Sequence, residues 1–82
     1  MADPERVRKL KWLCRRGKKE LDVLLEQFVA YHHQELQAGQ WPEFETLLQA
    51  EDDVLWDLLQ NPQSAGEAAV TSLLEQIRQA HA

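Results

Sequence analysis

The sequence predicts an all-α fold, a small bundle of five helices in a single domain over residues 1–82. Apolar residues recur at three- and four-residue spacing in several stretches, as on one face of a helix, and no stretch alternates like a half-buried strand. With 82 residues, 44% of them hydrophobic, the chain can bury one modest core. Because the expected connections are short, neighbouring helices should pack roughly antiparallel.

The first two helices are expected on either side of a glycine turn. The first begins at Pro4 with Asp3 as N-cap and ends at about residue 15, and Gly17 follows where a left-handed residue commonly stops a helix. The second is expected from Lys18 to Leu36. Their apolar faces comprise Val7, Leu10 and Cys14, then Leu21, Leu24, Leu25 and Phe28, continued by Tyr31 or His32.

Three shorter helices are expected in the remaining sequence. After the turn at residues 38–40, Pro42 opens the third helix, and Asp52 or Asp53 is the expected N-cap of the fourth, which Asn61-Pro62 ends. The fifth is expected to start at Ser64, in a capping box with Glu67, and its tail from Gln79 to Ala82 to fray. Their inward residues are Phe44, Leu47 and Leu48, then Leu55, Leu58 and Leu59, then Val70, Leu73, Leu74 and Ile77.

Charge is divided unevenly along the chain, whose net charge is −5. After residue 20 the only Lys or Arg is Arg78, among eleven acids, and the other eight are Arg6, Arg8, Lys9, Lys11, Arg15, Arg16, Lys18 and Lys19. Such a basic N-terminal segment could attract a nucleic-acid backbone or an acidic protein surface. Since nucleic-acid-binding domains usually carry a basic overall charge, we expect a protein partner and no nucleic acid.

Cys14 is the only cysteine, which excludes an internal disulfide and a site with several thiolates, and favours a reducing compartment. Neither a membrane-spanning stretch nor the apolar core of a signal peptide is present, so we expect no membrane insertion. Asp3, Glu5 and Glu20, with no serine among residues 1–20, argue against a mitochondrial transit sequence. We therefore expect a protein of the bacterial cytoplasm that is monomeric when free.

Sites for chemistry are few. His32 and His33 would point about 100° apart on a helix, and His32 with Glu35 offers only two ligands, so no metal site is expected. Cys14 continues the apolar spacing and is interpreted as a buried thiol, although the neighbouring cations could activate it. The three scattered glycines form no phosphate-binding loop. The sequence does not indicate an enzyme.

Two tryptophans and one acidic turn need a separate interpretation. Trp12 lies off the apolar line of the first helix and could be either an interface anchor or a core residue. Trp41 is expected to cap the core at the start of the third helix. The acidic turn at residues 51–53 lacks the spacing of a calcium loop and is interpreted as a solvated helix start.

Residues 14–22 form the most unusual stretch, with four basic residues around Gly17 and two acids on the following turn. A helix end with solvated charges would explain Gly17. A helix end explains the whole set of charges less well, because Arg16 and Glu20 flank the turn and could project to the same side of it. The Arg16 guanidinium would then offer hydrogen-bond donors, and the Glu20 carboxylate would offer acceptors. An interaction site and a simple helix cap are both consistent with these residues.

The stretch Cys-Arg-Arg-Gly-Lys-Lys-Glu-Leu-Asp resembles the Arg-Gly-x-x-Glu signature, in its fuller form, of the FAD assembly factors of succinate dehydrogenase, the SdhE family. The chain length, the position of the signature and the downstream segments at 44–48 and 51–52 are also similar to that family. The family usually has proline and tryptophan where this chain has Asp53 and Leu58, with Trp56 two positions earlier.

The resemblance implies a five-helix bundle that binds the flavoprotein subunit of succinate dehydrogenase, and often of fumarate reductase. It implies that the factor promotes covalent attachment of FAD to a histidine of that subunit and holds no stably bound cofactor itself. The partner-binding residues that it implies are Arg16, Gly17 and Glu20, with Arg15, Asp22, Lys9, Lys11 and Asp52 on the same face.

Two other classes of function remain open at this point. The basic first helix and the turn at Gly17 could belong to a DNA-binding helix-turn-helix module, whose affinity would fall steeply with salt. The chain could also be a helical adaptor unrelated to flavin.

Overall fold

The computed structural model describes residues 4–81, so Asp3, the expected first N-cap, and Ala82 lie outside the described residues. Within this range the chain is all-helical and has no strand, as predicted, but it forms six α-helices rather than five. They are α1 (Pro4–Leu13), α2 (Lys19–Tyr31), α3 (His33–Gln37), α4 (Pro42–Leu47), α5 (Asp52–Gln60) and α6 (Ala68–His81), with a 3-10 helix η1 (Pro62–Ala65) before the last.

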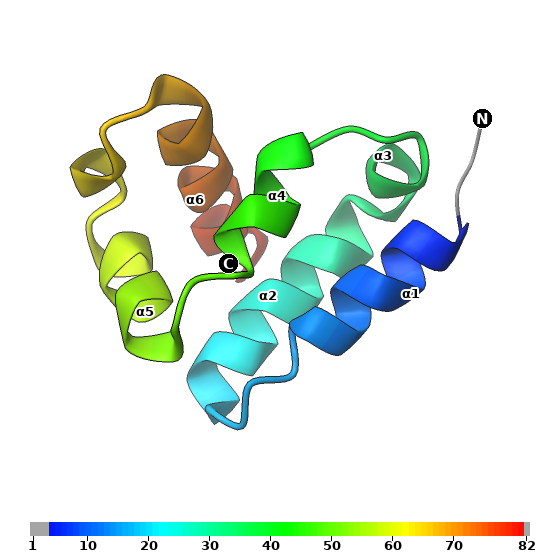
Figure 1. Ribbon diagram of the computed structural model, residues 1–82, viewed down its shortest axis with the longest axis horizontal. Coiled ribbons are helices and arrows are strands. Elements are labelled where there is room, and N and C mark those ends of the chain that lie inside the picture. Colours follow the sequence, from blue (N-terminus) through cyan, green and yellow to red (C-terminus); the bar gives the residue numbers. More distant parts are fainter. Residues whose placement is uncertain (1–3, 82) are drawn as a thin grey trace.

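The helices are arranged around α2, which packs most extensively against α6 and also contacts α1 and α3. Figure 1 shows α1 and α2 side by side, running in opposite directions, as the short connection predicted. In that view α4 lies between the group of α1, α2 and α3 and the group of α5 and α6. The loop between α1 and α2 lies at one end of the molecule, near the start of α5, where Arg16 of the loop contacts Asp52.

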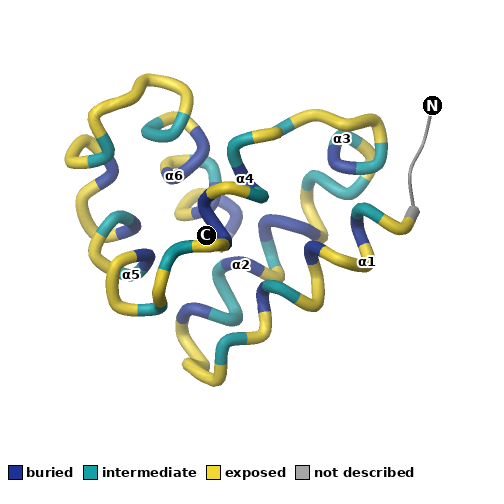
Figure 2. Tube along the Cα trace, viewed as in Figure 1, coloured by how far each residue is buried: buried dark blue, intermediate teal, exposed yellow. Residues whose placement is uncertain are grey.

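The predicted apolar faces form one core. Figure 2 shows the buried segments turned toward the space between the helices. Three of the predicted core residues, Leu24, Leu58 and Val70, lie at the edge and are only partly buried. The buried hydrophobic residues of this core are Val7, Leu10, Cys14, Leu21, Leu25, Phe28, Val29, Leu36, Phe44, Leu47, Leu48, Leu55, Leu59, Leu73, Leu74, Ile77 and Ala80.

The expected helix over residues 18–36 is in fact broken at His32, which separates α2 from α3. No glycine or proline marks the break in the sequence. His32 leaves helical geometry, and its ring packs against Phe28 and Trp41, at centroid distances of 4.6 and 5.5 Å. His32 therefore continues the apolar face, whereas Tyr31 is 71% exposed. These tertiary contacts hold a bend that helix periodicity alone could not predict.

Gly17 has the expected left-handed backbone, with φ of +84°, but it does not stop the first helix. Helix α1 already ends at Leu13, and Gly17 lies within the connecting loop. Trp41 also has a left-handed backbone, directly before α4, with φ of 59°. It is partly buried against the core, which confirms the expectation that Trp41 caps the core there.

The predicted N-caps of the last two long helices are wrong. Glu51 precedes α5 and makes no side-chain cap bond; the Asp52 carboxylate pairs with Arg16 instead, and Asp53 accepts a hydrogen bond from the N–H of Val54.

Ser64 lies inside η1, where its hydroxyl donates to the carbonyl of Asn61, so it forms no capping box. Gly66, with φ of 80°, ends η1 before α6 begins. Helix α6 then continues through His81, and the expected fraying from Gln79 is not found in the part of the tail that is described.

Candidate functional site

The loop between α1 and α2 is closed from within by Asp22. One carboxylate oxygen accepts a hydrogen bond from the backbone N–H of Arg16 at 2.8 Å, and the other accepts one from the N–H of Gly17 at 3.3 Å. These two donors would otherwise have only solvent as a partner at the turn. Asp22 thus has a definite structural role, in addition to any contact with a partner.

The Arg16 side chain is directed into the molecule. Its Nη1 donates to the carbonyl of Ala50 at 2.6 Å and lies 3.0 Å from the Asp52 carboxylate, and its Nη2 donates to the carbonyl of Leu48. The side chain is only 11% exposed. Its donors are therefore engaged within the molecule and do not project to one side of the turn with Glu20, as the sequence allowed. Arg16 instead fastens the loop to the connection between α4 and α5.

Arg6 makes a similar set of contacts at the other end of α4, a role that its position in the sequence does not predict. Its Nε donates to Glu45 at 2.6 Å, its Nη2 donates to the carbonyl of Trp41 at 3.1 Å, and its Nη1 donates to the carbonyl of Leu36. Among eight basic residues near the N-terminus, no local pattern distinguishes the two that turn inward. Only the fold separates structural from exposed cations.

The surface that the loop presents is open at Gly17. Gly17 is exposed, and a Cβ built there would meet nothing within 4 Å. Glu20, Arg15, Lys9 and Lys11 are also exposed. The contacts thus bring Arg16, Gly17, Asp22 and Asp52 together, whereas Lys9 and Lys11 are exposed residues of α1 outside this set.

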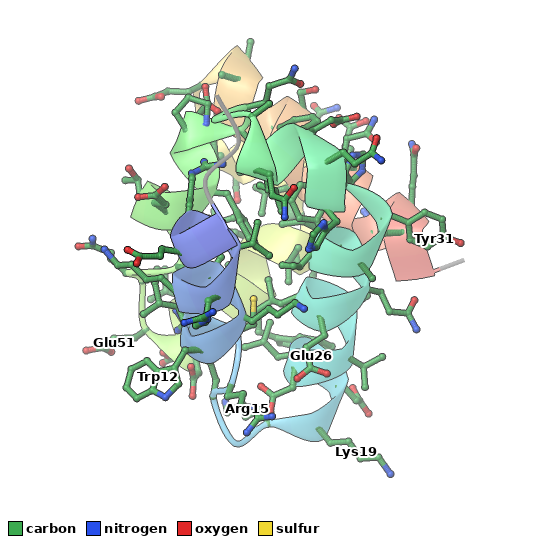
Figure 3. The ribbon with its side chains drawn as sticks, turned by 90° about the vertical axis from the view of Figure 1, so that its right-hand side faces the viewer. Trp12, Arg15, Lys19, Glu26, Tyr31 and Glu51 are labelled. Atoms are coloured by element: carbon green, nitrogen blue, oxygen red, sulfur yellow. The ribbon has the colours of Figure 1, made fainter. Side chains whose placement is uncertain are left out.

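Trp12 is 75% exposed, which decides between its two interpretations in favour of the surface. Figure 3 shows Trp12 projecting from α1 away from the bundle, near the end at which the loop and Arg15 lie. With Glu5, Arg8 and Lys9 it lines a shallow hollow on the outer side of α1. An exposed tryptophan among cations is typical of a protein interface.

A larger groove lies beside Glu20. It has a volume of about 690 Å³ and is lined by Lys19, Glu20, Val23, Leu24, Trp56, Leu59, Gln60 and Arg78. In the sequence Trp56 is notable only as a departure from the family pattern, but in the structure it lines the same hollow as the signature residue Glu20. Asp53, which is exposed, and Leu58, which is partly buried against the core, are not among the residues that line this groove.

The chemistry available to individual side chains is limited. Burial, with a smaller contribution from the charge of Glu26, raises the pKa of the Cys14 thiol to about 12, so it is neither exposed nor ionised at neutral pH. This confirms the interpretation of a buried thiol. Among residues 4–81, no group of three His, Cys, Asp or Glu side chains could hold a metal ion.

Glu35 links the end of α3 to the residue before α4. Its Oε1 accepts a hydrogen bond from the Trp41 indole at 2.8 Å and lies 2.9 Å from Nδ1 of His32. The bond from Trp41 first, and then that from His32, lower the pKa of the Glu35 carboxyl. His32 is thus near the core edge and paired within the protein.

Comparison with known families gives a match over nearly the whole chain. Residues 8–81 match the family described as flavinator of succinate dehydrogenase.

In the described residues, no helix is both long and apolar enough to cross a membrane. No solved structure matches the chain.

Curated relatives from bacteria bear the name FAD assembly factor SdhE. The protein from Coxiella burnetii is 32% identical over 79 residues, which are 96% of this chain and 96% of that protein. That from Haemophilus ducreyi is 32% identical over 95% of this chain and 94% of its own length. That from Xylella fastidiosa is 31% identical over 95% of this chain and 80% of its own length.

Proposed function

We infer the function of this chain from its family: it belongs to the flavinators of succinate dehydrogenase, which include the SdhE FAD assembly factors. We propose that it binds the flavoprotein subunit of succinate dehydrogenase and promotes the covalent attachment of FAD to that subunit. The family is one of assembly factors rather than enzymes, so the bond-forming groups belong to the partner. FAD is the cargo of the reaction and is not held stably by this protein.

The observation that carries this proposal furthest is the rigid, open turn at Gly17. Its backbone is fixed by Asp22 and, through Arg16, by the connection between α4 and α5. Because no side chain covers Gly17, a partner backbone can approach closely there. Glu20, exposed on the first turn of α2, can then accept hydrogen bonds from the partner.

Positioning explains how such a protein can accelerate flavin attachment without a catalytic group. Holding the flavin and the accepting histidine of the subunit in reactive geometry can lower a barrier by several kcal/mol. A turn that is already ordered loses little conformational entropy when it binds. Arg16 and Asp52 contribute by holding the turn, whereas Gly17 and Glu20 contact the partner.

The partner range and cellular setting are part of the same proposal. We propose that the protein is monomeric when free, acts in the bacterial cytoplasm, and also serves the flavoprotein of fumarate reductase. The exposed cations Lys9, Lys11 and Arg15 would contribute long-range attraction to an acidic surface of these subunits. No specific contact in the described residues favours a DNA-binding or a general adaptor role.

Two variants test the proposal. Gly17→Arg and Glu20→Ala should fold but leave the flavoprotein subunit with less covalent flavin, measured by in-gel flavin fluorescence after co-expression. Glu26→Ala, which removes another exposed acid of α2, is the matched control and should flavinylate normally. Normal flavinylation with both site variants would contradict the proposal.

A further inference from the structure

The groove beside Glu20 combines an apolar floor with a charged rim. Val23 and Leu24 of α2 and Trp56 and Leu59 of α5 supply apolar side chains. The groove extends toward the start of α2, where Lys18, Lys19 and Leu21 lie with Trp56 in an adjoining hollow. The two hollows share Lys19, Glu20 and Trp56, so they form one continuous surface.

The charges at the rim are mainly positive. Lys19 and Arg78 line the groove and Lys18 lines its extension, against the single carboxylate of Glu20. Arg78 is the only Lys or Arg after residue 20, in a stretch with eleven acids. The one cation that the acidic part of the chain supplies is therefore at the groove.

We propose that this groove receives an acidic segment of the flavoprotein subunit. An apolar side chain of that segment packs on Trp56 and Leu24, and flanking carboxylates pair with Lys19 and Arg78. The eleven acids of residues 21–82 repel such a segment from the rest of that part of the chain, which favours its placement at Arg78 and Lys19. This inference rests on the proposed function and adds a second contact region beside the turn at Gly17.

The lining favours a peptide over free FAD as the occupant. It consists of side chains from α2, α5 and α6 and of Lys18, directly before α2, with no glycine among the lining residues. A diphosphate is typically cradled by successive backbone N–H groups of a glycine-rich loop, which these residues do not provide. An extended chain with alternating apolar and acidic side chains matches a half-apolar groove with cations at its edge.

Photo-crosslinking identifies the occupant directly. The photoreactive residue p-benzoylphenylalanine replaces Gln60 in the groove or, as control, Gln63, which lies outside it. Each full-length variant is mixed with the flavoprotein subunit produced without covalent FAD, irradiated, and mapped by mass spectrometry. The expected result is a crosslink from position 60, and not from position 63, to an acidic segment of the subunit.

A complex that crosslinks from position 60 to a non-acidic segment, to a second copy of this chain, or to nothing overturns the inference and leaves the proposed function intact. Failure to form any complex overturns both. Free FAD is tested separately by equilibrium dialysis. Binding of free FAD that is lost in Trp56→Ala would assign the groove to the flavin and contradict the inference.

A matched pair of charge variants tests the role of Arg78. Arg78→Gln and Gln79→Glu each change the net charge by −1 at adjacent exposed positions of α6, but only Arg78 lines the groove. Arg78→Gln should raise the Kd for the subunit roughly tenfold, and Arg78→Lys should restore most of the affinity. If Arg78→Gln and Gln79→Glu raise the Kd equally, Arg78 acts only through the net charge of the protein. That result would overturn its assignment as a contact residue of the groove.

Discussion

Arg16 Nη1 lies 3.0 Å from the carboxylate of Asp52, and this pair joins the loop after α1 to the first turn of α5. Arg6 and Glu45 form a second pair, at 2.6 Å, between α1 and α4. Arg6 also donates to the carbonyls of Leu36 in α3 and Trp41 before α4, and Arg16 donates to those of Leu48 and Ala50 after α4. The basic N-terminal segment is thus fastened at two points, and the turn at Gly17 is held against the rest of the bundle.

Arg16→Ala should destabilise the protein, because it removes three hydrogen bonds and leaves carbonyls and a carboxylate with fewer donors. We expect a loss of about 2–4 kcal/mol in the free energy of unfolding, measured by urea denaturation followed by circular dichroism. Arg15→Ala, at the adjacent exposed position, should change it by less than about 0.5 kcal/mol. Equal stability of the two variants would show that the Arg16 contacts contribute nothing.

Asp22→Ala should loosen the turn locally. The N–H groups of Arg16 and Gly17 lose their acceptor, so their amide hydrogens should exchange with solvent faster than in the unmodified protein. Asp57→Ala, which removes an exposed acid of α5, should leave those two amides unchanged. Hydrogen exchange measured by NMR gives the result residue by residue. Unchanged exchange at both amides in Asp22→Ala would contradict the assignment.

Substitutions at Gly17 should separate stability from partner binding. Gly17→Ala and Gly17→Arg should each cost about 1 kcal/mol, because a left-handed backbone disfavours any Cβ and the surrounding space is open. Gly17→Asn should cost less, since asparagine tolerates this backbone. Only the arginine should strongly weaken binding to the flavoprotein subunit, as measured by titration calorimetry. Equal binding by Gly17→Ala and Gly17→Arg would place the contact elsewhere.

Cys14 should make stability fall in alkaline solution. Its pKa is raised from 9.0 to about 12 on folding, so its contribution is fully present below 9.0 and is lost as the pH rises toward 12. Cys14→Ala should show a weaker decline over that range. In the native protein at neutral pH, the thiol should react with a disulfide reagent only at the rate of unfolding. Rapid labelling of the folded protein would contradict burial of this group.

Glu35 should make stability fall in acid. The carboxyl has a pKa lowered from 4.5, so its contribution is present above 4.5 and is lost as the pH falls below that value, through the folded pKa. For each protein, the midpoint of urea unfolding is measured at one pH above 4.5 and at one pH below it. The difference between the two midpoints should be smaller for Glu35→Gln than for the unmodified protein. The same acid sensitivity in both proteins would remove Glu35 as its source.

Periodicity was sufficient to predict the all-α class and most of the core, because each helix buries one apolar face, but the buried residues Val29, Leu36 and Ala80 were not predicted. It could not predict the break at His32, which depends on ring contacts with Phe28 and Trp41. The cap of α5 was also missed for a tertiary reason, since the Asp52 carboxylate is occupied by Arg16 from another segment. In both places a contact with a residue from another segment, which the local sequence does not show, determines the backbone or the cap.

The sequence signature indicated where the candidate site lies. It did not show which of its residues are exposed to a partner and which hold the loop in place. Arg15 and Arg16 are adjacent and chemically identical, and only the fold shows that one is exposed and the other is inserted beneath the loop. The approach of Trp56 and Arg78 to Glu20 joins residues from α5, α6 and α2. No spacing within a single helix could have predicted that groove.

The most direct test of the proposed function is the intact mass of the flavoprotein subunit after co-expression with this protein or with Glu20→Ala, in cells that lack their own assembly factor. With the unmodified protein, the subunit should carry the added mass of one covalent FAD. With Glu20→Ala, whose folding is checked by circular dichroism, most of the subunit should lack it. Full FAD addition with Glu20→Ala, or none with the unmodified protein, would contradict the account.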